Sequence, residues 1–207
     1  MLEILGHLDQ SLLALIKDYG FWSYFILGAI VFGETGLVVL PMLPGDSLLF
    51  VTGAAAASGV IDIGSIIMVL SFAATLGNLS NFYIGRWVAP HLFKNAHSRW
   101  LNPDYLARTH AFYEKHGGKT VILARFIPIV RTYAPFAAGL GTMEAHRFQI
   151  YSGVGAVTWV GTMVGAGYLF GDIPLIKGNL SLISLGIIIV TLLPALIGGL
   201  RSARNSA

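Results

Sequence analysis

Three long windows without a charged residue constrain the fold of this chain more than any other feature. They cover residues 63–85, 148–171 and 178–200, and each holds at least 23 residues. A helix needs about 20 consecutive apolar residues to cross the hydrocarbon core of a bilayer. The sequence therefore predicts three membrane-spanning helices in an all-α integral membrane protein.

The composition agrees with a membrane protein and excludes several kinds of site. Charged residues make up 11% of the chain, whereas they make up about 25% of an average soluble domain. The apolar runs recur as far as the C-terminus, which is not the pattern of a secreted protein with one signal peptide. Because the chain has no cysteine, it can form no disulfide and no thiolate metal site. We expect no metal, no cofactor and no nucleic-acid partner.

The first of two broken apolar regions covers residues 21–58. Its centre, VVLPMLPGDSLLF at residues 38–50, combines helix breakers with an acid. Proline removes a backbone donor and glycine is a poor helix former. We therefore expect the chain to turn inside the membrane and leave on the same side, with the break at Pro41, Pro44 and Gly45. Glu34 and Asp46 place two carboxylates beside this break.

The second broken region covers residues 119–141 and contains the stretch ARFIPIVRTYAP. It carries two cations, Arg125 and Arg131, and we expect its break at Pro128 and Pro135. Irregular backbone is tolerated at membrane depth only where protein covers it or a water-filled cavity lies beside it. Both broken regions are therefore predicted to be re-entrant helical hairpins.

The distribution of Lys and Arg predicts how these elements are oriented. The segment 86–119 carries six Lys or Arg residues, and cytoplasmic segments of membrane proteins are rich in these residues. With this segment in the cytoplasm, the first hairpin enters from the outer face and the second from the inner face. The same rule predicts a cytoplasmic C-terminus after the last spanning helix.

These orientations predict a single membrane domain, residues 1–207, built as an inverted repeat. The first half covers 1–86 and the second 104–171, each with one re-entrant hairpin and one spanning helix, and the helix 178–200 is additional. An amphipathic stretch before each hairpin, at residues 5–17 and 104–115, is expected to lie on the membrane surface. Many transporters are inverted repeats whose sites lie near the bilayer midplane at discontinuous helices.

Four ionisable residues are predicted to lie at membrane depth. Each costs roughly 2.5–3.5 kcal/mol on insertion scales, so mutual pairing would offset part of the cost. Arg125 and Arg131 are candidate ligands of a phosphate or carboxylate, because a guanidinium donates two parallel hydrogen bonds to such groups. Glu34 and Asp46 are candidates for holding the arginines, for exchanging protons, or for both. The alternative is that the four charges only hold the two hairpin tips together.

Two weaker patterns lie in the spanning helices. Asn78 and Asn81 in the window 63–85 are expected to form hydrogen bonds between helices. A face of small residues in the window 148–171 is expected to allow close helix packing, and it consists of Gly153, Gly155, Gly161, Gly165 and Gly167.

Three stretches of this chain resemble the DedA family of bacterial inner-membrane proteins, which are related to eukaryotic VTT-domain lipid scramblases. They read GETGLVVLPMLPGDSLLFVTGAAAASG, GNLSNFYIGRWV and HGGKTVILARFIPIVRTYAPFAAGLGTM. The important acids and arginines of the family match Glu34, Asp46, Arg125 and Arg131 here. The sequence departs from the family pattern at Asn78, where an aspartate is common.

The resemblance implies a flippase that moves undecaprenyl phosphate across the bacterial inner membrane for carrier recycling, linked to the proton motive force. A passive phospholipid scramblase, for phosphatidylethanolamine, is one alternative, and a membrane structural or assembly protein is another. An enzyme such as a lipid phosphatase is disfavoured, because the chain has no recognisable nucleophile or metal motif. The expected partners are the bilayer and a lipid with a phosphate head group, and the chain is compatible with a homo-oligomer.

Overall fold

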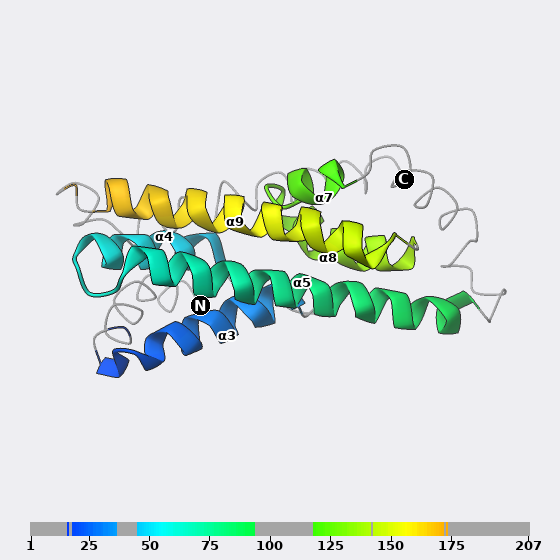
Figure 1. Ribbon diagram of the computed structural model, residues 1–207, viewed down its shortest axis with the longest axis horizontal. Helices are drawn as coiled ribbons and strands as arrows, with labels where there is room; N and C mark the ends of the chain where they lie inside the picture. Colours follow the sequence, from blue (N-terminus) through cyan, green and yellow to red (C-terminus); the bar gives the residue numbers. More distant parts are fainter. Residues whose placement is uncertain are drawn as a thin grey trace, which may run out of the picture. The chain divides into compact units, whose positions relative to one another are not determined.

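The computed structural model describes residues 18–36, 45–93, 118–141 and 143–171, together with Ile16 and Ile173 (Figure 1). These residues form six helices and contain no strand, which confirms the all-α prediction. The helices are α3 (Trp22–Gly36), α4 (Gly45–Ala57), α5 (Ile63–Phe93), α7 (Lys119–Ala124), α8 (Pro128–Leu140) and α9 (Ala145–Phe170).

Two helices, α5 and α9, are long and apolar enough to cross a membrane. The candidate spans are Ile63–Ala89 and Ala145–Phe170, with 27 and 26 residues, or about 40 Å at 1.5 Å per residue. Two of the three predicted spans are thus found as helices of sufficient length. Helix α5 continues to Phe93, beyond the predicted end at residue 85, because Arg86 ends the uncharged window without breaking a helix. The predicted helix 178–200 lies outside the described residues.

Helices α3 and α4 correspond to the two arms predicted on either side of the first break. They have 15 and 13 residues, or roughly 20 Å each, so neither alone crosses a 30 Å hydrocarbon core. Gly45 is the first residue of α4. Pro41 and Pro44 lie outside the described residues. The stretches predicted to form surface helices, 5–17 and 104–115, also lie outside them, apart from Ile16.

The second break lies between α7 and α8, at residues 125–127. Ile127 is extended, with φ −113° and ψ 109°, because the residue before a proline is driven out of the helical region. Pro128 is the first residue of α8, a position where its missing N–H costs no hydrogen bond. Pro135 differs from the prediction, because it lies inside α8 and not at a break. Its fixed φ is compatible with the helix, although it cannot donate to the carbonyl of Arg131.

The described helices fall into two compact units, and the boundary runs through α3, α5 and α9. Unit 1 contains α4, the beginnings of α3 and α5, up to Leu27 and Leu70, and the end of α9, from Val160. Unit 2 contains the end of α3, most of α5, α7, α8 and the beginning of α9, up to Trp159.

Unit 1 is held by close backbone contact between α4 and α9. A Cβ added at Gly53 would collide with the Val164 carbonyl, and one added at Gly167 would collide with the Phe50 carbonyl. Glycine is therefore required at both positions for the backbones to approach. The predicted packing of the glycine face is confirmed at Gly167, whereas Cβ atoms at Gly153, Gly161 and Gly165 would meet no described atom within 4 Å.

Unit 2 has an aromatic core. The rings of Phe82 and Phe148 stack with centroids 4.4 Å apart, and Val121 and Ala138 complete the buried cluster. These four residues come from α5, α9, α7 and α8, so the cluster fixes the α7–α8 hairpin against both long helices.

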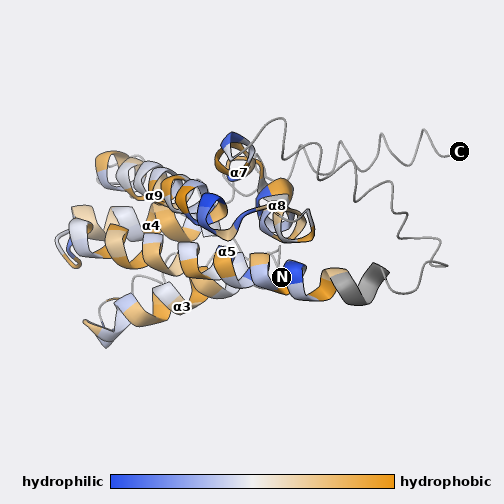
Figure 2. Ribbon diagram, turned by 45° about the vertical axis from the view of Figure 1, so that its right-hand side comes forward, coloured by the Kyte–Doolittle hydropathy of each residue, from blue (hydrophilic) through white to orange (hydrophobic). Residues whose placement is uncertain are grey.

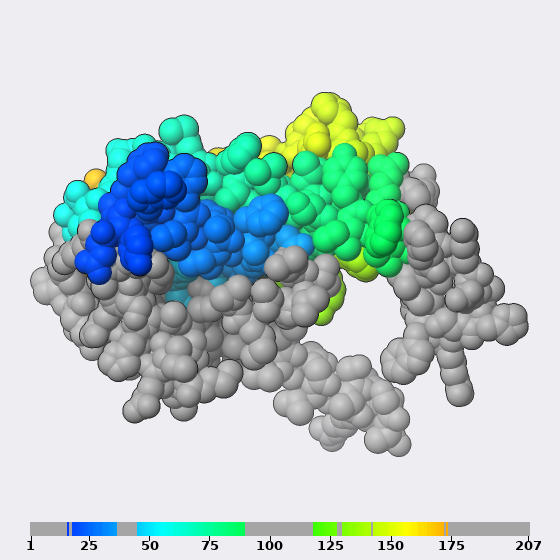
Figure 3. Space-filling view, turned by 90° about the horizontal axis from the view of Figure 1, so that it is seen from below, coloured from blue at the N-terminus to red at the C-terminus, as the bar shows by residue number. Residues whose placement is uncertain are grey.

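Large apolar side chains are exposed along the helices, and the colouring of Figure 2 shows hydrophobic residues along the described helices. On α5 they recur at helical spacing, at Met68, Phe72, Leu76, Tyr83 and Trp87. Near the beginning of α3 the exposed residues are Trp22 and Phe25, and α3 lies at the surface in the view of Figure 3. Exposed apolar stripes of this extent are the surface that lipid covers in a membrane protein.

Candidate functional site

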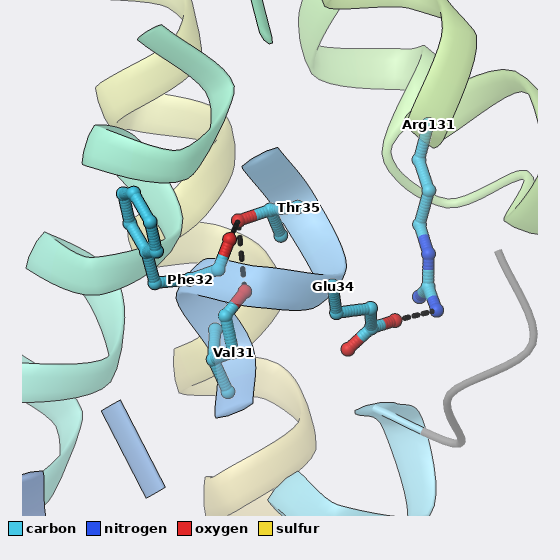
Figure 4. Close-up of polar contacts among 5 residues, drawn as sticks. All are labelled: Val31, Phe32, Glu34, Thr35 and Arg131. Atoms are coloured by element: carbon cyan, nitrogen blue, oxygen red, sulfur yellow. Dashed lines mark hydrogen bonds and ion pairs between the residues drawn. The ribbon is translucent and has the colours of Figure 1, made fainter. Parts of the chain in front are cut away.

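The centre of the candidate site is a buried ion pair between α3 and α8 in unit 2. Arg131 Nη2 donates a hydrogen bond of 2.6 Å to Glu34 Oε1, and Figure 4 shows the two side chains pointing toward each other. The exposed fractions of the two side chains are 13% for Arg131 and 4% for Glu34. The short distance and the burial make this a charge-assisted hydrogen bond.

Both partners lie at the helix end that is electrostatically unfavourable for them. Glu34 is in the last turn of α3, where the helix dipole is negative, and Arg131 is in the first turn of α8, where it is positive. Neither charge stabilises its own helix, so their mutual attraction offsets the cost at both ends. The arrangement leaves the positive end of α8 beside a cation, which is a favourable environment for an anion.

Arg125 is the second cation of the site, and its surroundings differ from those of Arg131. It follows α7 at the break and is 4% exposed. Its Nη2 donates to Ser152 Oγ over a long 3.5 Å, and its Nε has no hydrogen-bond partner among the described residues. Across the described ranges Arg125 also makes no ion pair. A buried guanidinium with so little compensation is expected to attract an anionic ligand.

A small cavity lies between these charged groups. Its lining residues are Glu34, Thr35, Asn78, Arg125, Arg131, Thr132 and Trp159. Its volume is about 10 Å³, enough for about one water molecule. In this conformation the cavity is therefore too small for a phosphate group, and a ligand can bind only after the lining side chains separate.

Trp159 and Ser152 complete the site from α9, and sequence reasoning missed both. The Cζ atom of Arg131 is 5.0 Å from the centroid of the Trp159 ring, and that of Arg125 is 5.8 Å away. Both distances are within the range of cation–π interactions. A tryptophan within an uncharged window has the same sequence signature as a lipid-facing or core residue, so nothing in the sequence distinguished it.

The two asparagines of α5 form the predicted hydrogen bonds between helices. Asn78 Nδ2 donates to Ser152 Oγ over 2.9 Å. Asn81 Nδ2 donates to the carbonyls of Thr132, at 2.8 Å, and Thr35, at 3.3 Å. The carbonyl of Thr35 is in the last turn of α3, where it has no partner within the helix. Asn81 therefore connects the end of α3 to α8. These are the same two helices that the ion pair between Glu34 and Arg131 joins.

Asp46, the fourth predicted charge, belongs to unit 1, whereas the other three belong to unit 2. It lies in the first turn of α4 and is 6% exposed, a position where the helix dipole stabilises a carboxylate. The structure thus brings together three of the four predicted charges, Glu34, Arg125 and Arg131, in one unit. No cluster of three or more His, Cys, Asp or Glu that could hold a metal occurs in the part of the chain that the structure describes.

Comparison with known proteins identifies the family. The VTT domain matches residues 43–169. Protein DedA of Escherichia coli K12 is 47% identical over 100% of this chain and 95% of its own length. An uncharacterized membrane protein of Mycobacterium leprae is 42% identical over 93% of this chain and 87% of its own length.

A more distant relative, inner membrane protein YghB of Escherichia coli K12, is 33% identical over 84% of this chain and 81% of its own length. No solved structure matches the chain. With helices long enough to cross a bilayer and relatives that are named as membrane proteins, the chain is a membrane protein. It belongs to the DedA family of VTT-domain membrane proteins.

Proposed function

We propose that this protein is a lipid translocase that moves undecaprenyl phosphate across the bacterial inner membrane for carrier recycling. The phosphate head would bind Arg125 and Arg131, and the polyprenyl tail would remain in the bilayer. No bond of the lipid is made or broken, so the protein is proposed to be a transporter and not an enzyme. The observation that carries the proposal is the buried Arg125 guanidinium, which makes no ion pair among the described residues.

The proposed topology has two re-entrant hairpins that enter from opposite faces, three spanning helices and a cytoplasmic C-terminus. The unit assignment supports it. The beginning of α3, up to Leu27, and the whole of α4 belong to unit 1, whereas α7 and α8 belong entirely to unit 2. The outer ends of the proposed first hairpin thus belong to one unit and the proposed second hairpin to the other, which agrees with the inverted repeat that we propose.

The small cavity between Glu34 and the two arginines suggests how transport would be coupled to protons. A phosphate that binds Arg131 must compete with the carboxylate of Glu34, because this carboxylate is the ion-pair partner of Arg131. Protonation of Glu34 would weaken this ion pair and favour exchange of the carboxylate for the phosphate. Asp46 is proposed to have a similar role. Binding and release of the lipid would then depend on the proton motive force.

A leaflet assay with purified protein in vesicles tests this proposal. Fluorescent polyprenyl phosphate and phosphatidylethanolamine would be followed between leaflets, with and without a pH gradient. We expect faster flux of polyprenyl phosphate, dependence on the gradient, and loss of flux in Arg131→Ala. The matched control is Arg147→Ala, because Arg147 is 73% exposed and pairs only weakly with Glu144 at the surface.

Other outcomes of the same assay would identify the alternatives. Equal flux of phosphatidylethanolamine without a gradient would indicate a passive phospholipid scramblase. Absence of flux for every lipid would indicate a structural or assembly role, in which the charges only hold the helices together. Either result would contradict the proposed translocase.

A further inference from the structure

We propose that one face of α9 positions both arginines of the site, with Trp159 as the residue that holds the two guanidinium groups together. This inference rests on the proposed function, because it concerns the same anion-binding site. Ser152 and Gly155 complete the positioning surface, which we call the α9 cradle. None of these three residues carries a charge, so their role is to place the cations that bind the ligand.

The α9 cradle follows the side chain of Arg125 along its length. Residues 152, 155 and 159 are three and four positions apart and therefore share a helix face. Arg125 Nη2 reaches Ser152 Oγ at 3.5 Å, and its Cζ lies 5.8 Å from the centre of the Trp159 ring. A Cβ at Gly155 would lie 3.3 Å from Nε and 3.4 Å from Cδ of Arg125. Glycine thus leaves room for the guanidinium to lie against the helix.

Trp159 contacts both cations, although they come from different elements. Arg125 follows α7, whereas Arg131 is in the first turn of α8, with its Cζ 5.0 Å from the same ring centre. Two neighbouring guanidinium groups repel each other, and the negative face of an indole ring attracts both. Trp159 is 1% exposed, and removal from water strengthens such an interaction. One ring therefore fixes two anion ligands that the break between α7 and α8 would otherwise leave independent.

The hydrogen bond from Asn78 to Ser152 supports the cradle from α5. Ser152 Oγ accepts from Asn78 Nδ2 at 2.9 Å as well as from Arg125. The amide of Asn78 orients the hydroxyl without adding a negative charge. The charge of Arg125 therefore stays available to an anionic ligand, since an amide does not neutralise it.

Binding of a soluble amphiphile to the purified, full-length protein in detergent micelles tests the role of Trp159. The probes are dodecyl phosphate and inorganic phosphate, which separate recognition of a lipid head group from binding of free phosphate. Calorimetry would measure the affinity for each. A variant in which Trp22, Trp87 and Trp100 are replaced by Phe keeps Trp159 as its one tryptophan. We expect dodecyl phosphate to change the fluorescence of this residue.

The substitutions at position 159 separate a cation–π role from simple packing. We expect Trp159→Leu to weaken dodecyl phosphate binding about 10-fold or more, and Trp159→Phe to retain part of the affinity. Trp87→Leu is the matched control, because Trp87 is 71% exposed, and it should bind as the wild type does. Gly155→Ala should also weaken binding, since the added methyl displaces Arg125.

Three results would overturn the proposal, and they have different meanings. If wild-type protein binds dodecyl phosphate and Trp159→Leu binds equally well, Trp159 does not position the arginines. If Trp159→Leu and Trp159→Phe reduce the affinity for dodecyl phosphate equally, the role of the indole ring is packing alone. If Trp159→Leu fails to fold, Gly155→Ala carries the test, and wild-type affinity in this variant would contradict the proposal. Absence of binding of both probes to the wild type would refute the proposed function itself.

Discussion

The α4–α9 contact of unit 1 and the α3–α8 contact of unit 2 join helices in opposite ways. In unit 1, Gly53 and Gly167 let two backbones approach until a methyl group no longer fits. In unit 2, an ion pair and the amide of Asn81 join the helices around a cavity of about 10 Å³. The first contact is sensitive to volume and the second to charge. The two contacts should therefore respond to different kinds of substitution.

The largest effect is expected where the buried ion pair of unit 2 is broken. Glu34→Ala leaves the Arg131 guanidinium without this carboxylate and should lower the free energy of unfolding by about 3–5 kcal/mol. Chemical denaturation in mild detergent would measure it.

The surface pair between Glu144 and Arg147 provides the control for that measurement. Its atoms are 3.7 Å apart and both side chains are more than 70% exposed, so Glu144→Ala should change stability by less than about 1 kcal/mol. The double variant Glu34→Leu with Arg131→Leu should be more stable than Glu34→Ala, since it leaves no buried charge from the pair. Equal effects of Glu34→Ala and Glu144→Ala would contradict the account of unit 2.

A methyl group at the contact of unit 1 is expected to have the next largest effect. Gly167→Ala would bring a Cβ against the Phe50 carbonyl, and such overpacking typically costs about 1–3 kcal/mol. Gly161→Ala is the matched control on the same helix, because its Cβ would meet no described atom within 4 Å. It should be neutral or stabilise α9 through higher helix propensity. Thermal unfolding compares the two variants, and similar melting temperatures would show that α4 and α9 are not closely packed.

The amide contact in unit 2 should have a smaller effect on stability. Asn81→Leu removes the hydrogen bonds to Thr35 and Thr132, and hydrogen bonds between membrane helices contribute about 0.6–1.7 kcal/mol. Ser80→Ala is the control, because the Ser80 hydroxyl donates only within α5, to the carbonyl of Leu76. A stability loss confined to Ser80→Ala would contradict the proposed connection between α3 and α8.

The smallest effect is expected at the exposed beginning of α5, in unit 1. The N–H of Ser65 donates to Asp62 Oδ2 over 2.7 Å, and this bond lowers the pKa of Asp62 below its usual value. Because the folded-state pKa is the lower one, the stabilisation is present above about pH 4 and is lost as pH falls through the folded pKa. Asp62→Ala should lower the melting temperature slightly at pH 7 and less at pH 3. Asp62→Asn keeps the cap, so its melting temperature should be nearly that of the wild type at pH 7.

The charges and the spans could be predicted because their signals are local. Uncharged windows identified α5 and α9, and the cost of burying a charge singled out Glu34, Arg125 and Arg131 before any contact was known. The break before Pro128 also follows from local sterics at Ile127. Pro135 was misplaced because a proline is compatible with a helix when the rest of the structure tolerates one missing donor.

The remaining parts of the site depend on tertiary contacts and could not be predicted. Trp159 and Ser152 acquire their roles only because the break after α7 brings Arg125 against α9. The same is true of glycines. Gly155 lies against Arg125, whereas a Cβ at Gly153 would meet no described atom within 4 Å, although the two glycines belong to one small-residue pattern. Periodicity in a sequence shows that residues share a face but not what that face contacts.

The most direct test of the central claim, that the buried guanidinium of Arg125 binds the phosphate of a lipid, is the flux of polyprenyl phosphate in vesicles that contain Arg125→Lys. Lysine keeps the charge but loses the planar pair of donors, so we expect flux to fall about 10-fold or more while the protein still inserts and stays monodisperse. Arg147→Lys should transport as the wild type does. Wild-type flux in Arg125→Lys would contradict the account.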